Sequence, residues 1–422
     1  MQEREVGFIE LLRVNQIFRK YWFAHTISML GEWFNTVALF VLLDQLTGSE
    51  LALGILFMIR MFALAFPQVF TGMLADRFSR KWLMVVANLG SAITVSCFLL
   101  INDENDVWLI YLLSALLMLF HAVYVPAENA AMPNITKPNE LLTANAMNSA
   151  TWSASLAIGA ALGGVIVAKF GVDIAFIVNA IAFILAGIII TTIDIPQKRD
   201  RTEGTFIAVS IAQVWDGFNI IRKNAAIYRI ITAKALWGIF GGGLVYMLVL
   251  LGSEIGLGEV AAGIGLMFAA RGIGTGLGPI IARYGLTNRE KWPLILGWLV
   301  SLCGIGYVTI GWLSWGWWIA IAVIFSHAAS GANWVISTVL LQERSEDEWR
   351  GRMFSTDFLL LTTVNGISTL AASMILEFTD YSLREVIQAF AICQVISGII
   401  WVILISPGEK KYIAQTKLLS GE

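Results

Sequence analysis

The chain has few of the residues from which soluble enzymes build their sites and surfaces. Only 14% of its 422 residues are charged, and it has three cysteines and three histidines. Cys97, Cys303 and Cys393 stand singly inside apolar runs, a spacing that suits neither a disulfide framework nor a metal site. We therefore expect buried, small apolar cysteines, and neither a metal nor a cofactor.

Nucleotide-binding signatures are also lacking. No Walker-type phosphate loop occurs, so this chain does not use ATP, and an ion gradient is left as the energy source. The glycine string RGIGTGLGPI, residues 271–280, resembles a dinucleotide loop, but it lies in an apolar run and not between a strand and a soluble helix. Its small residues instead predict close helix packing. With no catalytic constellation, the sequence predicts neither an enzyme nor a nucleotide or nucleic-acid binder.

What the chain does have is apolar length. Hydrophobic residues make up 57% of it and the mean hydropathy is +0.74, which is typical of a membrane protein. The apolar runs do not alternate in polarity as barrel strands do, so we predict an all-α integral membrane protein with twelve transmembrane helices. The expected spans are 17–43, 51–75, 81–101, 107–130, 139–168, 171–194, 226–252, 259–283, 291–312, 316–341, 350–377 and 382–406.

The positions of Lys and Arg predict the orientation. If the N-terminus is cytoplasmic, nearly all bases near the span ends lie inside, and only Lys169 and Arg384 lie outside. The expected outer loop INDEND, residues 101–106, is purely acidic. Residues 1–20 lack the apolar core of a cleavable signal, and FIELLRVNQIF is expected to lie along the membrane surface. We therefore expect a multi-pass protein of the cell inner (plasma) membrane with both termini cytoplasmic.

The sequence indicates that the chain contains two copies of a six-helix unit. Segment 195–224 is the longest polar interruption, and apolar residues at helical spacing within it predict a helix lying on the inner surface. The second and eighth spans share an arginine and a proline at corresponding points, namely Arg60 with Arg271 and Pro67 with Pro279. We predict an N-terminal bundle (1–194), a cytoplasmic linker (195–224) and a C-terminal bundle (225–422).

The loop GMLADRFSRKWLM between the second and third spans carries a family signature. It resembles the signature loop of the major facilitator superfamily, with Ser79 in place of the usual Gly, through Gly72, Leu74, Ala75, Asp76, Arg77, Phe78, Arg80, Lys81 and Leu83. The resemblance covers the whole chain and implies two pseudo-symmetric six-helix bundles, usually as a monomer. It also implies that the loop latches the two halves, with Asp76 near Gly351 and Arg352 at the start of the eleventh span. The alternative is that these bases only hold the loop inside.

Two longer stretches, residues 125–150 and 340–355, look like the branch that includes macrolide and siderophore (enterobactin) exporters. The family's antiporter motif in the fifth span is matched at Gly159, Ala160, Leu162, Gly163 and Gly164, but its Pro is missing. The resemblance therefore implies proton antiport, on a motif that is incomplete.

Polar residues recur at helical spacing inside several spans, and buried polar groups are expected to face an interior cavity because lipid cannot solvate them. The family resemblance implies that the first, fourth, seventh and tenth spans line that cavity. Together these arguments give the expected substrate-cavity residues Asn35, Arg60, Tyr124, Asn148, Trp152, Lys234, Trp237, Arg271, Asn333 and Trp334.

Glu32, near the middle of the first span, is the preferred proton-coupling residue, because burial disfavours a charged carboxylate. If it forms a permanent pair with one of the intramembrane bases, it is structural instead, and both interpretations stay open. Arg60 and Arg271 are either helix clamps or anion-binding groups. The further proton-relay candidates are His25, His121 and His327. Glu128 lies near the inner surface and is expected to be a gate contact.

The sequence thus predicts a secondary active transporter that works by alternating access and exports a small, amphipathic organic molecule in exchange for protons. Its expected partners are that substrate, protons and membrane lipid. Two alternatives stay open: a lysolipid or lipid flippase, and nutrient uptake by proton symport.

Overall fold

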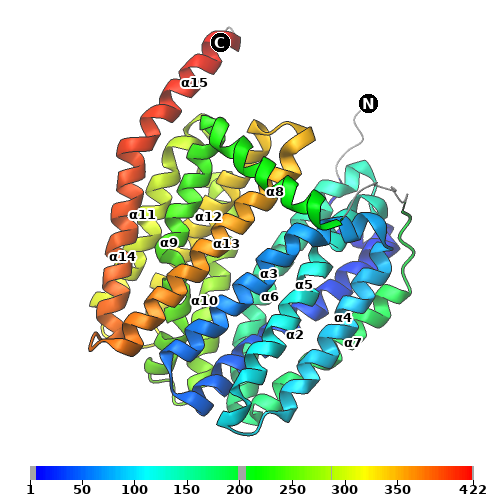
Figure 1. Cartoon of the computed structure of the whole chain (residues 1–422), viewed down its shortest axis with the longest axis vertical. Helices are drawn as coiled ribbons and strands as arrows, with labels where there is room; N and C mark the ends of the chain where they lie inside the picture. The colour runs from blue at the N-terminus through cyan, green and yellow to red at the C-terminus, as the bar shows by residue number, and fades with distance from the viewer. Residues whose placement is uncertain (1–5, 198–205, 287, 421–422) are drawn as a thin grey trace. The chain divides into compact units, whose positions relative to one another are not determined.

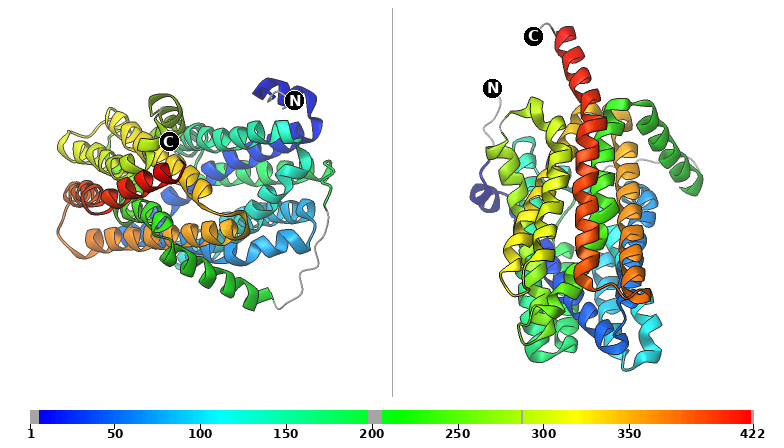
Figure 2. Two further views of the ribbon diagram at one scale, coloured as in Figure 1. Left: turned by 90° about the horizontal axis from the view of Figure 1, so that it is seen from above. Right: turned by 90° about the vertical axis from the view of Figure 1, so that its left-hand side faces the viewer.

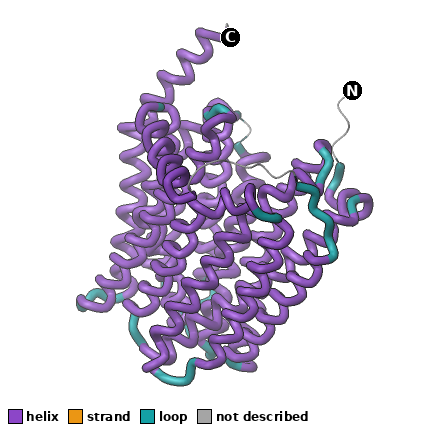
Figure 3. Tube along the Cα trace, turned by 45° about the vertical axis from the view of Figure 1, so that its right-hand side comes forward, coloured by secondary structure: helices purple, strands orange, loops and turns teal. Residues whose placement is uncertain are grey.

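The computed structural model describes residues 6–197, 206–286 and 288–420, and all regular structure in these residues is helical (Figure 3). Twelve of the helices in this part of the chain are long and apolar enough to cross a membrane. They are α2 (Gln16–Thr47), α3 (Glu50–Arg77), α4 (Arg80–Cys97), α5 (Val107–Ile135), α6 (Pro138–Phe170), α7 (Val172–Thr191), α9 (Ala225–Glu254), α10 (Val260–Ile280), α11 (Trp292–Trp312), α12 (Ile319–Arg344), α13 (Asp347–Phe378) and α14 (Leu383–Ile400). The predicted all-α fold with twelve spans is therefore confirmed.

There are three further helices of two turns or more: α1 (Phe8–Val14), α8 (Phe206–Lys223) and α15 (Ser406–Ser420), of which α15 begins within the last candidate span, Leu383–Gln415. α8 falls where the linker was expected to form a helix, while residues 198–205 of that linker lie outside the described residues. Short 3₁₀ turns (Phe98–Leu100, Glu104–Asp106, Arg289–Lys291) and π turns (Ile281–Gly285, Trp401–Ile405) complete the helical structure. Figure 2 shows that α15 continues the line of α14.

Tight turns between the spans depend on glycine. Gly48 ends α2 with φ of 56°, and Gly171 separates α6 from α7 with φ of 82°. Both values lie in the region that residues with a Cβ atom rarely adopt, so glycine lets the chain reverse with few exposed backbone groups. Glycine therefore allows a short turn after α2 and between α6 and α7.

Asn15 accounts for the break between α1 and α2. Its side chain accepts a 2.9 Å hydrogen bond from the amide of Phe18, which caps α2, and its Nδ2 atom donates to Ile135 O and Glu140 Oε2, both at 2.8 Å. This side chain therefore ties the start of α2 to the junction between α5 and α6.

The chain divides into two compact units. Unit 1 comprises residues 1–48, 59–210 and 259–269, and unit 2 comprises residues 49–58, 211–258 and 270–422. The first turns of α3 thus belong to unit 2 and those of α10 to unit 1. The predicted boundaries 1–194, 195–224 and 225–422 do not include this exchange of segments and stay a prediction.

Each unit repeats the same internal packing. In unit 1, α2 packs against α6 and α7, and α4 packs against α5 and α7 (Figure 1). In unit 2, α9 packs against α13 and α14, and α11 packs against α12 and α14. Counted within each half, both sets are the first span on the fifth and sixth, and the third span on the fourth and sixth. This equivalence is the pseudo-symmetry that the sequence predicted.

The glycine string of α10 packs closely within unit 2. A Cβ atom on Gly274 would lie 2.5 Å from Ile324 O, and one on Gly278 would lie 2.4 Å from Ala332 N, both in α12. The prediction of close helix packing is confirmed at these two positions, since any side chain there would collide with the backbone of α12.

The expectation of three buried cysteines is wrong in part. Cys303 is buried, Cys97 is half-buried and Cys393 is exposed. Because α14 presents Cys393 on its outer face, an apolar thiol can be accommodated there by lipid as well as by protein.

Candidate functional site

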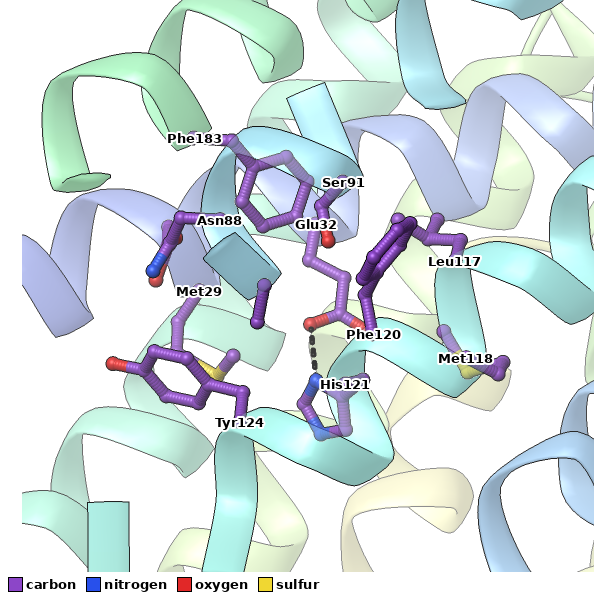
Figure 4. Close-up of a pocket in the computed structure, with 12 residues that line it drawn as sticks. Met29, Glu32, Asn88, Ser91, Leu117, Met118, Phe120, His121, Tyr124 and Phe183 are labelled. Carbon is purple, nitrogen blue, oxygen red and sulfur yellow. Dashed lines mark ion pairs between the residues drawn. The ribbon is translucent and has the colours of Figure 1, made fainter. Parts of the chain in front are cut away.

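Glu32 stands at the centre of the polar face of α2 in unit 1. Its Oε1 atom lies 4.0 Å from Nη2 of Arg60 on α3, and its Oε2 atom lies 3.6 Å from Nδ1 of His121 on α5 (Figure 4). Nη2 of Arg60 also lies 3.4 Å from the Thr36 hydroxyl, one turn along α2. Both distances to Glu32 exceed that of a hydrogen bond, so the carboxylate is flanked by two bases without a direct hydrogen bond to either.

A small cavity opens beside this carboxylate. It is lined by residues of α2, α4, α5 and α7, with Ser28, Glu32, Asn88, Ser91, His121 and Tyr124 as its polar members. The centre of a water molecule has about 20 Å³ in which to move, which is enough for one water. Figure 4 shows the Glu32 carboxylate pointing toward the His121 ring among the residues that line this cavity. A polar cavity of this size suits an ordered water that contacts the carboxylate.

A second cluster lies two turns away on the same helices. Nδ1 of His25 is 2.7 Å from Oε1 of Glu128, and both side chains are less than a tenth exposed. The Tyr21 hydroxyl donates a hydrogen bond to Glu128 and accepts one of 2.7 Å from Nδ2 of Asn148 on α6. The expected gate residue Glu128 is thus held within unit 1 by three neighbours, and its gate role stays a prediction.

Unit 2 contains a buried ion pair that the sequence predicted only in half. Nζ of Lys234 lies 2.5 Å from Oδ2 of Asp357 on α13, and it also lies 4.5 Å from the centre of the Trp334 ring. The pairing and the cation–π contact together hold the ammonium group between two helices. Glu32 was the carboxylate that the sequence offered as a partner for an intramembrane base. It belongs to unit 1, whereas this ion pair lies in unit 2.

His327 and Arg271 lie near Tyr307. Nε2 of His327 is 2.9 Å from the Tyr307 hydroxyl, and Arg271 is close enough to interact electrostatically with both residues. The Tyr307 hydroxyl gives His327 a neutral hydrogen-bonding partner, and the proton-relay role of His327 stays a prediction.

The other expected cavity residues differ in exposure. Asn35 and Asn333 are buried, and within the described chain both polar atoms of the Asn35 amide, and Oδ1 of Asn333, have no hydrogen-bond partner. Trp152 and Trp334 are exposed, while Trp237 is half-buried. Buried amides without partners are costly, and this cost suits a role in contacting a substrate or water.

The residues of the expected latch are described in part. Arg80 donates from Nη1 to Ala130 O at 2.7 Å, and Nζ of Lys81 lies 5.9 Å from the centre of the Trp82 ring. Gly72, Asp76 and Arg77 lie at the end of α3, but the side chain of Asp76 lies outside the described residues.

On the other side of the expected latch, Gly351 is exposed on α13 and Arg352 forms a 3.3 Å ion pair with Asp216 of α8. The latch interaction itself stays a prediction.

Sequence reasoning missed two charged or polar partners that the structure brings into these clusters. Tyr21 lies four residues before His25 and so extends the polar stripe of α2 by one turn, a signal that was present in the spacing. Asp357 stands alone in the apolar run of α13, and a lone carboxylate in such a run requires a partner. Its partner on α9 could not be chosen without the packing of the helices.

Comparison with known proteins places this chain among membrane transporters. The model of the Major Facilitator Superfamily matches residues 21–369. Macrolide efflux protein A of Streptococcus pyogenes is 20% identical over 353 residues, which cover 80% of this chain and 84% of the relative. The enterobactin exporter EntS of Salmonella typhi is 26% identical over 358 residues, 82% of either chain. The MFS-type transporter YfiS of Bacillus subtilis is 32% identical over 173 residues, and that match spans only 40% of either protein.

The fold is also shared with solved transporters. A bacterial homologue of the human lysosomal transporter Spinster, in an inward-facing and unoccupied conformation, superposes with a TM-score of 0.67 at 15% identity over 96% of this chain and 97% of that one. Such a likeness shows the fold alone, whereas the family model covers most of the sequence. The chain therefore belongs to the major facilitator superfamily and is a multi-pass secondary transporter of a small molecule, not an enzyme.

Proposed function

We propose that this protein exports a small, amphipathic organic molecule in exchange for protons, by alternating access, with Glu32 as the residue that binds the proton. The export direction is supported by two relatives whose names describe efflux of a macrolide and export of enterobactin. We also propose that the protein is a monomer of the inner (plasma) membrane. The distribution of Lys and Arg supports the cytoplasmic position of both termini.

The surroundings of Glu32 carry the proposal. A carboxylate in a closed, hydrogen-bonded ion pair stays ionised, but the two bases that flank Glu32 lie beyond hydrogen-bonding distance and a water-sized cavity adjoins it. Water beside a carboxylate gives a proton a way in and out. We infer from these surroundings that Glu32 changes its protonation during transport.

The proposed substrate contacts are Asn35 and Asn333, whose amide oxygens have no hydrogen-bond partner among the described residues, the exposed rings of Trp152 and Trp334, and the remaining expected cavity residues, namely Arg60, Tyr124, Asn148, Lys234, Trp237 and Arg271. Exposed aromatic rings suit an amphipathic molecule, because they offer a flat apolar face and attract cations. The two arginines would favour a substrate that also carries an acidic group, whereas Lys234 already pairs with Asp357.

The test uses purified protein in liposomes and the macrolide erythromycin. An imposed pH gradient should drive erythromycin transport by the wild type, and Glu32→Gln should abolish this dependence while the protein still binds the drug. Binding is measured as thermal stabilisation, which reaches about 2.7 kcal/mol at a hundred times the dissociation constant. Glu343→Gln, the same change at an exposed pair with Arg289, is the matched control and should transport normally.

Unchanged pH-driven transport in Glu32→Gln would refute the coupling role. If only lysolipids stabilise the protein, the flippase alternative takes its place, and stabilisation by sugars alone would favour nutrient uptake by symport. Each ligand class is screened in the same thermal assay, so these outcomes are separated before transport is measured.

A further inference from the structure

Two carboxylate–histidine pairs link α2 and α5 in a crossed arrangement. α2 contributes His25 and Glu32, while α5 contributes His121 and Glu128, and the two members on each helix are seven positions apart. Because the helices run in opposite directions here, Glu32 faces His121 at 3.6 Å and His25 faces Glu128 at 2.7 Å. Each pair therefore joins a carboxylate to an imidazole, with the carboxylate on α2 in one pair and on α5 in the other.

We propose that His25 and Glu128 form a second proton-binding site of the transporter, coupled to the site at Glu32 and His121. This inference rests on the proposed function, because it extends the path of the proton that Glu32 binds. Histidine is the side chain whose charge changes most readily near neutral pH, and a buried imidazole beside a carboxylate can hold the pair neutral overall or with one additional proton. A Lys or Arg in its place would make a permanent ion pair.

The contacts of the pair favour a titrating site over a closed structural one. Within the described chain, Nε2 of His25 has no hydrogen-bond partner, which leaves one ring nitrogen available for proton exchange. Glu128 accepts a hydrogen bond from the Tyr21 hydroxyl, and Asn148 lies 3.5 Å from the same carboxylate oxygen. These two neutral groups stabilise the carboxylate without supplying a permanent cation.

Tyr124 lies between the two sites. It is three residues from His121 and four from Glu128 on α5, which places it on the same helix face as both. Its ring lines the cavity beside Glu32, its side chain is buried, and within the described chain its hydroxyl has no hydrogen-bond partner. An unpartnered hydroxyl at this point suits a water that passes a proton from one pair to the other.

Charged and polar side chains from several helices face the two carboxylates, Glu128 and Glu32. Glu128 faces Tyr21 and His25 from α2, and Tyr124 and His121 from its own helix, with the uncharged Asn148 from α6. Glu32 faces Arg60 from α3 and His121 from α5. His121 therefore interacts with both carboxylates, and the charge of one site is felt at the other.

The expected size of this coupling follows from geometry. Seven residues of helix separate the sites by about 10 Å, and two unit charges at that distance change each other's proton affinity by roughly tenfold at the effective dielectric of a protein. A proton bound at Glu32 should thus promote release at the His25–Glu128 pair. The protonation of the two sites would then alternate during the transport cycle.

The chain's three histidines make the test direct. The full protein, labelled with ¹⁵N-histidine and reconstituted in lipid, should give three sets of imidazole signals, which His25→Asn, His121→Asn and His327→Asn assign by loss. In the wild type, the His25 signal should change between the neutral and cationic forms when the pH is varied. His327 hydrogen-bonds to Tyr307 and serves as the internal reference.

Glu128→Gln should keep the His25 signal neutral at pH values where the wild-type signal is cationic, because the amide no longer stabilises the imidazolium. Glu32→Gln should alter the His121 signal directly and displace the conversion of His25 by about one pH unit, which is the tenfold coupling. Tyr21→Phe, which keeps the ring and removes one hydrogen bond to Glu128, gives a milder perturbation if Glu128→Gln does not fold.

A His25 signal that stays in one form at every pH, or that is the same in Tyr21→Phe, Glu128→Gln and the wild type, would overturn the second site. If His25 titrates but Glu32→Gln leaves pH-driven erythromycin transport unchanged, the second proton site stands and the proposed role of Glu32 fails. The histidine signals do not depend on transport, so the two failures are distinguished.

Discussion

Lys234 on α9 and Asp357 on α13 meet within unit 2 with Nζ 2.5 Å from Oδ2, and both side chains are only 4% exposed. Oδ1 of the same Asp has no hydrogen-bond partner within the described residues. The carboxylate thus depends heavily on one ammonium group, and that group has the ring of Trp334 as its other contact. A buried pair of this kind makes strong predictions, because removing one member leaves a charge that nothing neutralises.

Lys234→Met and Asp357→Leu should each lower the free energy of unfolding by about 3–5 kcal/mol, because each leaves an uncompensated buried charge. The double variant should recover most of this loss, since two apolar side chains can pack together without any charge to solvate. Denaturation of the four proteins in one detergent measures the cycle. Additive losses would show that the pair is not an energetic unit, and lost transport in a stable double variant would assign the pair to substrate binding.

Gly278→Leu should destabilise unit 2. A Cβ atom at this position would lie 2.4 Å from the amide nitrogen of Ala332 and 2.6 Å from Gly331 Cα, so α10 and α12 must separate to admit the side chain. Overpacking of this kind costs about 1–3 kcal/mol. Gly285→Ala is the control, because the nearest atom to its Cβ is Ile281 Cγ2 at an ordinary 3.7 Å. Equal melting temperatures for the two variants would contradict the close approach of the helices.

Glu409→Ala should release α15 from unit 2. Glu409 is fully buried, with Oε1 2.5 Å from Arg229 Nε and Oε2 2.6 Å from Arg344 Nη2. Its loss leaves two arginines without their carboxylate, at a cost of about 3–5 kcal/mol. We expect faster protease cleavage within α15, whereas Lys410→Ala, at an exposed neighbouring position, should be cleaved at the wild-type rate. Wild-type resistance of Glu409→Ala would show that α15 is held by its other contacts.

Arg352 distinguishes the expected latch from a local contact. Its ion pair with Asp216 is 3.3 Å long and partly exposed, so breaking it with Asp216→Asn should change stability by no more than about 1 kcal/mol and leave erythromycin transport intact. Arg352→Gln removes the cation as well and should slow transport if the latch role holds. Equal transport by the two variants, measured in the same liposome assay, would confine Arg352 to its contact with α8.

Much of this fold follows from the sequence alone. A span needs about 20 apolar residues to cross a bilayer, so composition and run length located all twelve helices before any packing was known. The internal repeat was visible in Arg60 and Arg271 because equivalent helices keep equivalent residues. The polar faces of α2 and α5 were likewise predictable, since helical spacing assigns residues three, four and seven apart to one face.

The tertiary structure decided which of those faces meet. The sequence placed His25 and Glu32 on one helix and His121 and Glu128 on another, but it could not say that each carboxylate faces the histidine of the other helix. That pairing depends on the antiparallel register of α2 against α5, which is set by the packing of α2 on α6 and α7 and of α5 on α4. The same holds for Asp357. Its position in an apolar run indicated that it needs a partner, but the identity of that partner, Lys234, depended on the packing of α9 against α13.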